Sequence, residues 1–316
     1  MMTNVAQSTL DGVLTVCKEV GWTSHDVVAK IRHVLGGAKV GHAGTLDPAA
    51  TGVLPVLIGR GTRIAEYLVE WDKEYRAVLR LGETTDTQDA TGTLVDRQFT
   101  GHITPAAIRE VASRFQGAIE QVPPMYSAVK VAGVPLYKSA RAGKTVARQA
   151  RTVTVHSLDI LEIDGQNVTL RVVCSKGTYV RTLCADLGAA LGVGGHLLSL
   201  ERSRVGPLML DQASTVDEVV ARYAIGDLGT AVISLDQALK AFPVVVVDDL
   251  ATERIRHGAP VQMSHVRDIP EDRHAVAESD QPVRVHDGEG RLLAIGKYRV
   301  SNEMVLAVEK LLVEPR

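Results

Sequence analysis

Hydrophobic positions recur along this chain with periods that predict both helices and strands. After Ser24 the apolar residues return at helical spacing, and the pair Gly36-Gly37 is typical of a helix end. We expect Ser24 to be the N-cap of this helix, with Asp26 in its first turn. The stretch 73–82 instead alternates apolar and polar residues in its second half, as a half-buried strand does.

The rest of the chain carries signals of the same two kinds. Thr104 is a capping residue and Pro105 suits a first helical position, so a helix is expected from there to about Phe115. Further strands are expected at 12–20, 168–174, 244–247, 283–286, 292–297 and 304–308, and short helices at 64–69, 184–190 and 251–257. From about Pro243 the strands are short and separated by glycine turns, which predicts a small β-rich domain.

Length and composition are those of a globular protein with two domains. The chain has 316 residues, 45% of them apolar but only 4% aromatic, so its core must be aliphatic. Cys17, Cys174 and Cys184 form no C-x-x-C pair and are expected to be reduced thiols of a cytoplasmic protein. No stretch is apolar enough for a membrane span, and no basic run precedes an apolar core near the start. We therefore expect neither a membrane anchor nor a signal peptide.

Charge is unevenly distributed, although the formal net charge is only −2. The segment 126–151 has no Asp or Glu and carries six cations, namely Lys130, Lys138, Arg141, Lys144, Arg148 and Arg151. A charge run is usually a solvated face, but uncompensated positives in a net acidic chain favour contact with a polyanion. Tyr126 and Tyr137 lie among them, as aromatics do on surfaces that hold RNA.

The candidate site is the stretch 41–63, with the sequence GHAGTLDPAATGVLPVLIGRGTR. Its single carboxylate, Asp47, precedes Pro48, which biases Asp47 toward an extended or turn conformation. The glycines around it permit backbone geometry that other residues resist. An acid on such a loop could be a nucleophile, a general base or a metal ligand. It could also simply cap a turn.

This stretch resembles the active-site segment of the TruB family of tRNA pseudouridine-55 synthases, with its G-T-L-D-P-x-A-T-G-V-L core. Residues 18–24 are similar to the family's K-P-x-G-x-T-S, with Glu19 in place of the proline. The loop 86–92 falls where the family has D-x-x-G, for which we expect a structural part. Four more stretches are similar to family motifs: 73–82 to K-x-Y-x-A-x-x-x-L-G, 121–128 to Q-x-P-P-x-Y-S-A, 176–183 to K-G-T-Y-[IV]-R-[ST]-L, and 196–206 to H-x-x-x-L-x-R-x-x-x-G.

The resemblance is strong over about residues 12–210 and weak beyond. It implies an α+β pseudouridine synthase fold, with a central mixed, mostly antiparallel sheet flanked by helices over residues 10–240. It also implies a basic thumb loop at about 126–151 that orders on RNA, and a small β-rich PUA-like domain over 243–316. Residues 243–290 carry ten Asp or Glu, five Arg and no Lys, so we expect that domain to be smaller or divergent.

Residue roles follow from the resemblance at the matching positions. Asp47 is implied as the catalyst, Arg181 as the cation that holds it ionised, and Tyr75 as the ring that stacks on the target base. The expected substrate-binding residues are His42, which would fill the space that flipped nucleotides leave, Tyr179 and Leu200 around the uracil, and Lys18, Lys130 and Arg141.

The implied reaction isomerises uridine 55 in the T-loop of tRNA to pseudouridine. The base is flipped out, its N-glycosidic bond is broken, and its C5 is joined to the ribose C1′. Because the product is an isomer, we expect no cofactor and no metal, and the chain has no P-loop and no G-x-S-x-G. Whether Asp47 attacks C1′ or C6 stays open, as does the base that removes the C5 proton.

Two alternatives remain at this point. A non-catalytic RNA-binding or RNA-folding protein would keep the basic segment but would not need Asp47, and a tRNA-folding role could also accompany catalysis. A related synthase could act on another uridine, although the G-T-L-D-P core favours the T-loop. The expected partner is the T-stem-loop of tRNA, with no membrane, no obligate protein partner and a monomeric protein.

Overall fold

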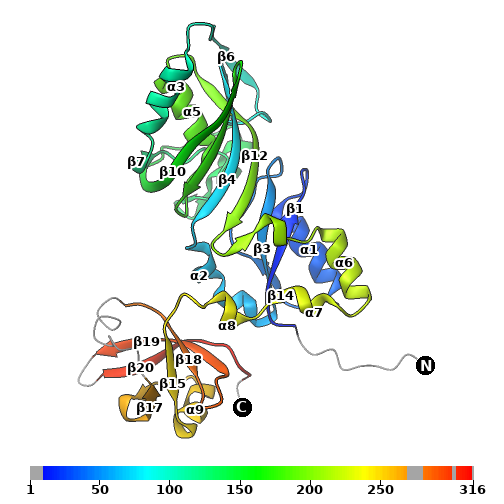
Figure 1. Cartoon of the computed structure of the whole chain (residues 1–316), viewed down its shortest axis with the longest axis vertical. Helices are drawn as coiled ribbons and strands as arrows, with labels where there is room; N and C mark the ends of the chain where they lie inside the picture. The colour runs from blue at the N-terminus through cyan, green and yellow to red at the C-terminus, as the bar shows by residue number, and fades with distance from the viewer. Residues whose placement is uncertain (1–9, 269–279, 301–303, 315–316) are drawn as a thin grey trace.

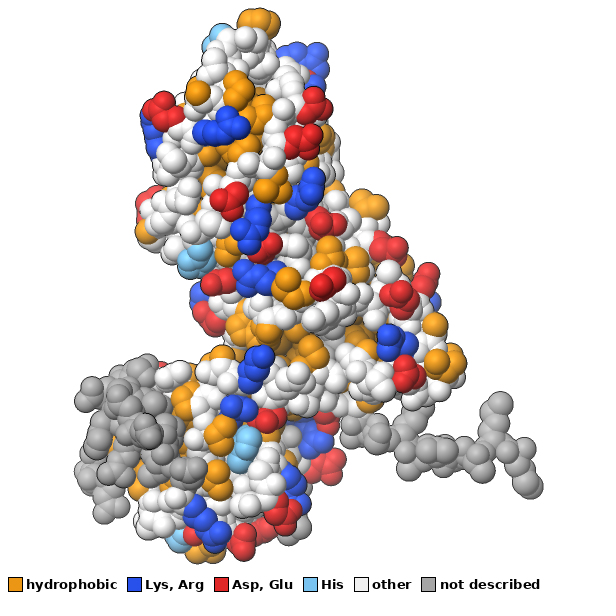
Figure 2. Space-filling model, viewed as in Figure 1, with side chains coloured by type: hydrophobic (Ala, Val, Ile, Leu, Met, Phe, Trp, Pro, Cys, Tyr) orange, Lys and Arg blue, Asp and Glu red, His pale blue; other side chains and the backbone are white. Residues whose placement is uncertain are grey.

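The computed structural model describes residues 10–268, 280–300 and 304–314 of the chain. The molecule is elongated and has two parts, as both the cartoon (Figure 1) and the space-filling view (Figure 2) show. The larger part is built on a long twisted sheet with helices against it. The smaller, C-terminal part is a separate sheet attached near α2 (Ala65–Val69) and α8 (Leu235–Ala238).

The large sheet has ten strands and the order β14-β1-β3-β12-β4-β11-β10-β7, with β13 paired to β12 and β2 paired to β3. Among these described strands, only β12 and β3 run parallel. This confirms the predicted mixed, mostly antiparallel sheet. The strands are β1 Gly12–Lys18, β2 Val40–His42, β3 Thr51–Ile58, β4 Lys73–Leu81, β7 Gly117–Gln121, β10 Arg151–Asp164, β11 Asn167–Cys174, β12 Gly195–Val205, β13 Leu208–Met209 and β14 Val232–Ile233.

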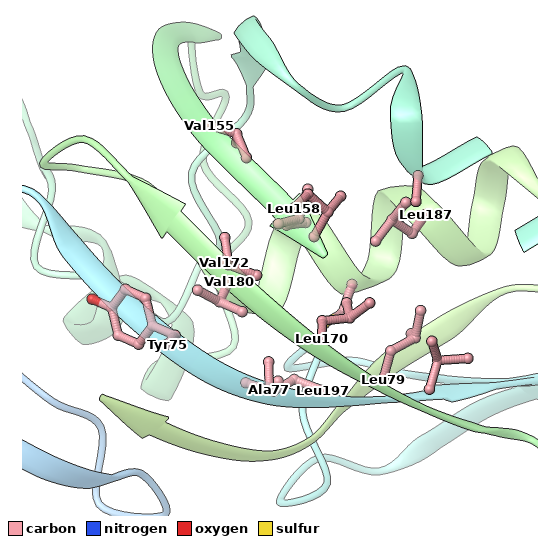
Figure 3. Packing of buried hydrophobic residues seen from close by; sticks show 14 of the residues in the cluster. Tyr75, Ala77, Leu79, Val155, Leu158, Leu170, Val172, Val180, Leu187 and Leu197 are labelled. Carbon is pink, nitrogen blue, oxygen red and sulfur yellow. The ribbon is translucent and has the colours of Figure 1, made fainter. Parts of the chain in front are cut away.

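Helices cover the two halves of this sheet separately. Against β10, β11 and β4 lie α3 (Pro105–Ser113) and α5 (Val180–Ala190), and aliphatic side chains such as Leu170 and Leu187 fill the space between them (Figure 3). Beside β1 and β3, α1 (Ser24–Val34) packs on α6 (Val216–Ala224), which is followed by α7 (Leu228–Ala231). No helix in the described ranges is long and apolar enough to cross a bilayer.

Several local predictions can be compared with the structure directly. Thr104 caps α3 with Pro105 in its first turn, as predicted. The predicted cap of α1 was wrong: Thr23 is the N-cap, and it forms a capping box with Asp26. Ser24 is instead the first helical residue, and its hydroxyl is used elsewhere. The first strand ends at Lys18, two residues earlier than expected, and the helix predicted from residue 64 is preceded by a 3-10 turn, Gly59–Ile64.

The basic segment 126–151 has more regular structure than its sequence indicates. A small hairpin of β8 (Lys130–Val131) and β9 (Val134–Pro135) leads into α4 (Leu136–Arg141). Leu136 is buried, whereas most side chains around it are exposed. A second small hairpin, β5 (Glu83–Thr85) with β6 (Leu94–Arg97), flanks the loop 86–92.

The C-terminal part has a six-stranded sheet and its own aliphatic core, which confirms the predicted β-rich domain. The sheet order is β16-β20-β19-β18-β15-β17. Its elements are β15 Val244–Val247, α9 Asp249–Arg256, β16 Val261–Gln262, β17 Val266–Asp268, β18 Val283–His286, β19 Leu292–Val300 and β20 Met304–Leu311. Arg284 and His286 both contact the Asp236 carboxylate in α8, at 2.9 and 2.8 Å, and so join the two parts.

Candidate active site

The loop that carries Asp47 joins β2 to β3 and is fixed from several sides. The Ser24 hydroxyl accepts a hydrogen bond from the Leu46 amide at 2.9 Å and donates to the Leu46 carbonyl at 3.2 Å. The Gly21 amide donates to the Pro48 carbonyl at 2.8 Å. The start of α1 therefore holds both flanks of Asp47, which explains why its loop is ordered without being part of a helix or strand.

Asp47 and Arg181 form an ion pair, as predicted from the sequence. The Nε of Arg181 lies 3.0 Å from Oδ2 of Asp47. The arginine side chain is only 6% exposed, whereas the aspartate side chain is 44% exposed. Arg181 is the second residue of α5, and that helix anchors it against the sheet. The cation is therefore fixed beneath a carboxylate that remains open to an incoming molecule.

Burial raises the pKa of Asp47 above the ordinary value for an aspartate, and the nearby Asp89 carboxylate adds to this effect. Arg181 and, more weakly, Lys18 lower the pKa, but their combined effect is the smaller one. The ion pair thus opposes protonation of Asp47 without fully cancelling the cost of desolvating it.

Asp89 was not among the predicted site residues, yet it is the second carboxylate of the site. Its Oδ2 lies 3.5 Å from Nη1 of Arg181, whereas Asp47 contacts Nε of the same guanidinium. Its Oδ1 accepts hydrogen bonds from the Thr87 hydroxyl and from the Thr91 amide, at 2.7 and 3.0 Å. Nη1 of Arg181 also donates to the Thr87 carbonyl at 3.4 Å. The D-x-x-G resemblance at 86–92 is the available signal, and it predicts a structural part for this loop.

An open cleft lies directly over this charge network. It encloses about 310 Å³ of empty space, part of which is open solvent at its mouth. Its walls combine the polar groups Asp47, Asp89 and Arg181 with a hydrophobic side formed by the irregular centre of β12. The remaining lining residues are Ala49, Ala50, Ala90, Thr91, Leu197, Leu198, Ser199 and Leu200. Leu200 therefore lines the same cleft as Asp47.

Tyr75 lies beneath the site rather than in the wall of the cleft. It is 8% exposed and belongs to the aliphatic cluster under β4. Figure 3 shows it at the edge of that cluster, with its hydroxyl pointing away from the aliphatic side chains. Burial raises the pKa of the Tyr75 hydroxyl, so it is protonated at neutral pH.

The remaining predicted residues differ in their surroundings. Lys18 is fully buried, and its Nζ donates to the carbonyls of Trp22 at 2.7 Å and Pro48 at 3.4 Å. Here its ammonium group supports the Asp47 loop, and substrate binding by Lys18 stays a prediction. His42 is half-buried, and burial lowers its pKa. Within the described part of the chain, its Nδ1 has no hydrogen-bond partner.

Tyr179 precedes α5 and is half-buried, outside the lining of the cleft. Its backbone amide donates to Gln121 at 2.7 Å, and its carbonyl accepts from the same side chain at 3.0 Å. Lys130 and Arg141 are exposed in the basic segment, and Arg141 lies 5.6 Å from the centre of the Tyr137 ring. No group of three His, Cys, Asp or Glu among the described residues is placed to hold a metal ion.

Comparison with known proteins gives matches over nearly the whole chain. A family model described as TruB family pseudouridylate synthase, N-terminal domain, matches residues 32–180, and one described as tRNA pseudouridylate synthase B, C-terminal domain, matches residues 181–242. A tRNA pseudouridine synthase B of Thermobifida fusca is 43% identical over 308 residues, which cover 94% of this chain and 98% of that protein. One of Burkholderia mallei is 44% identical and covers 98% of this chain and 99% of that protein. The chain belongs to the TruB family of pseudouridylate synthases.

Solved structures place this TruB-family chain in the same fold. One similar structure is an H/ACA ribonucleoprotein bound to a substrate RNA containing 2′-deoxyuridine. Its matching chain is 27% identical to this one with a TM-score of 0.72, and the match covers 96% of this chain and 86% of that one. An archaeal box H/ACA Nop10–Cbf5 complex gives 28% identity and a TM-score of 0.73, with 97% and 88% covered. The predicted pseudouridine synthase fold is therefore confirmed. The protein is a TruB-type tRNA pseudouridine synthase, which is an isomerase.

Proposed function

We propose that this synthase converts uridine 55 in the T-loop of tRNA to pseudouridine, with Asp47 as the essential catalyst. The main support for this proposal is one observation: the buried Arg181 guanidinium holds the half-exposed Asp47 carboxylate in the lining of an open cleft. A bidentate or fixed cation gives a carboxylate a defined direction as well as a charge. Such a carboxylate is suited to act on a sugar carbon or on a ring carbon of a bound nucleotide.

The reaction needs one bond to be replaced by another on the same sugar. The bond between the uracil N1 and C1′ breaks, the bond between C5 and C1′ forms, C5 loses its proton, and N1 gains one. No electrons are transferred to or from another molecule. Asp47 would act either as a nucleophile or by stabilising positive charge on the sugar. Glycosidases usually use two carboxylates. Here Asp89 already contacts Arg181, so it is placed to orient that cation.

The target base must leave its stack before it can reach Asp47, at a cost on the order of a few kcal/mol. In the proposed complex Leu200 and Tyr179 shape the uracil pocket and Tyr75 stacks on the base. Tyr75 is buried in the uncomplexed protein, so this stacking requires its cover to shift when RNA binds. His42, neutral and with an unsatisfied ring nitrogen, would fill the space vacated in the RNA.

The basic segment 126–151 is the proposed RNA-binding surface. None of its six cations forms an ion pair with a carboxylate in the described part of the chain. By contrast, surface cations of the C-terminal domain such as Arg299 and Lys297 are paired with Glu309 and Asp280. Unpaired cations release more counterions when they meet phosphates. The segment is also coupled to the site, since Nη2 of Arg181 donates to the Tyr126 carbonyl at 2.8 Å.

Tritium release from a tRNA transcript labelled at C5 of uridine tests the proposal. Wild-type protein should release tritium stoichiometrically, and Asp47→Asn should release none while it still binds the transcript. A transcript with cytidine in place of uridine 55 should give no release with either protein. Release that persists in Asp47→Asn would refute the role of Asp47. Release from the cytidine-55 transcript would refute the assignment of the target uridine.

A further inference from the structure

Arg202, in β12, is a buried cation that the proposed site does not yet use. Its side chain is among the largest fully buried ones, with the residue 1% exposed. Its Nε donates to the Val53 carbonyl at 2.7 Å, and its Nη2 donates to the Gly44 carbonyl at 3.0 Å. Its Nη1 lies 3.5 Å from the Thr45 carbonyl, at the limit of a hydrogen bond. Through these contacts the guanidinium binds both ends of the loop that carries Asp47.

A buried charge without a counter-ion is expensive for a folded protein. Within the described residues, no ion pair joins a carboxylate to Arg202; its guanidinium donates to three backbone carbonyls and interacts with the Tyr75 hydroxyl, all of which are neutral. Carbonyl dipoles offset only part of the desolvation cost. A neutral side chain of similar volume would fill this position at a lower cost, so the charge is expected to serve the loop it binds.

The backbone around Arg202 is adapted to this contact. Gly52 pairs with Arg202 across the parallel strands, and a Cβ atom at Gly52 would lie 2.2 Å from the Arg202 carbonyl oxygen. Gly44 has a φ of +96°, and a Cβ there would lie 3.5 Å from Nη1. Both glycines thus adopt conformations that L side chains rarely occupy. Gly52 thus lets β3 pack directly on the Arg202 backbone, and Gly44 brings the loop into van der Waals contact with the guanidinium.

Arg202 also faces the strand that carries Tyr75. The two residues are direct partners in the register of β12 with β4. The Arg202 guanidinium acts on the Tyr75 hydroxyl, where it opposes the rise in pKa that burial causes. A single side chain therefore touches the Asp47 loop on one side and Tyr75 on the other.

We propose that Arg202 is a positioning residue that fixes the Asp47 loop relative to the strand carrying Tyr75. The proposal rests on the catalytic role proposed above for Asp47. Arg202 does not reach the cleft itself, so it acts on the reaction through the loop. Loss of its hydrogen bonds should leave RNA binding by the exposed basic segment intact and should disturb the geometry of the chemical step.

The test compares Arg202→Met and Arg202→Lys with a matched control, Lys73→Met. Lys73 is a second buried cation on the neighbouring strand, but its Nζ donates to the Val69 and Trp71 carbonyls, away from the Asp47 loop. Tritium release is measured under single-turnover conditions and normalised to the folded fraction, together with the concentration of tRNA that gives half-maximal rate. Arg202→Lys keeps the charge but not the planar fork of donors.

We expect the maximal rate of Arg202→Met to fall about 100-fold, as a small misplacement of a reacting group can cause. Arg202→Lys should fall less, and both should keep the half-maximal tRNA concentration within about threefold. Lys73→Met should lose stability but keep its rate. If Arg202→Met retains its rate, or loses no more than Lys73→Met, the positioning role is refuted. If Arg202→Met does not fold, Arg202→Lys decides by the same criterion.

Asp47→Asn in the same assay separates the two proposals. If Asp47→Asn is inactive while both Arg202 variants are active, only the positioning role fails. If Asp47→Asn is active, the proposed catalytic role of Asp47 fails first, and the role of Arg202 fails with it.

Discussion

Replacing Arg181 should separate the two effects that this cation has on Asp47. Arg181→Gln removes the charge, and Arg181→Lys keeps a charge but loses the fixed direction of the guanidinium. At the observed distance of 3.0 Å, Coulomb attraction between the two groups would be about 1.4 kcal/mol in water and about 5.5 kcal/mol at an effective dielectric constant of 20. Because the Asp47 side chain is 44% exposed, water screens the pair and the lower value is the better guide.

A loss of about 1.4 kcal/mol corresponds to about tenfold in rate. Misdirection of the carboxylate should add to this, so we expect Arg181→Gln to react about 100-fold or more slowly at neutral pH. Arg181→Lys should be slow as well, because a lysine ammonium cannot reproduce the contacts to Asp47, Asp89 and the Tyr126 carbonyl together.

The pH dependence of the rate distinguishes the loss of the Arg181 charge from the loss of its fixed direction. In the proposed mechanism Asp47 acts as a carboxylate, so activity should be present above its pKa and be lost as the pH falls through it. Removal of the Arg181 charge raises the Asp47 pKa further, so the acidic limb of the pH–rate profile should move to higher pH in Arg181→Gln. It should stay near the wild-type position in Arg181→Lys. Single-turnover tritium release from pH 5 upward measures both. An unshifted limb in Arg181→Gln, or a rate within about threefold of wild type, would refute this reasoning.

Three other perturbations are worth measuring. Asp89→Asn keeps the shape of its side chain but loses the charge opposite Arg181, so the single-turnover rate should fall about 10- to 100-fold while filter binding to tRNA changes little. Lys130→Ala with Arg141→Ala should weaken tRNA binding and make the slope of log K against log salt shallower by about 0.9 for each phosphate contact removed, with an unchanged rate at saturation. Burial raises the pKa of Cys174 to about 11 and raises that of Cys184 still further, so a thiol reagent at pH 8 should modify them only after unfolding in urea; rapid modification of the native protein would contradict their burial.

Much of the fold follows from local pattern. The alternation in 73–82 gives β4 nearly residue for residue, and Thr104 with Pro105 marks the start of α3. Local chemistry was less decisive where two capping residues are adjacent. Thr23 and Ser24 are both suitable caps, and the choice between them depends on Ser24 reaching Leu46, which is 22 positions away.

The residues of the candidate site also fall into two groups: those that sequence motifs predict and those that depend on long-range contacts. Asp47, Arg181 and Leu200 were found through motif resemblance, and the structure brings them together at one cleft. Asp89 was missed because its importance depends on a long-range contact, which a polar turn does not reveal. Lys18 was expected to bind substrate, and nothing in its local sequence indicates that it is buried. Its burial depends on three backbone carbonyls that the folded chain places around it.

The close approach of Gly52 to Arg202 also has a consequence for how this enzyme can diversify. A side chain at residue 52 would meet the Arg202 backbone at 2.2 Å and would have to adopt a φ of +102°, so no substitution there is tolerated without moving β3 or β12. In a saturation library selected for synthase activity, this codon should therefore return to glycine. New RNA preferences should arise more readily from the exposed side chains of the basic segment 126–151.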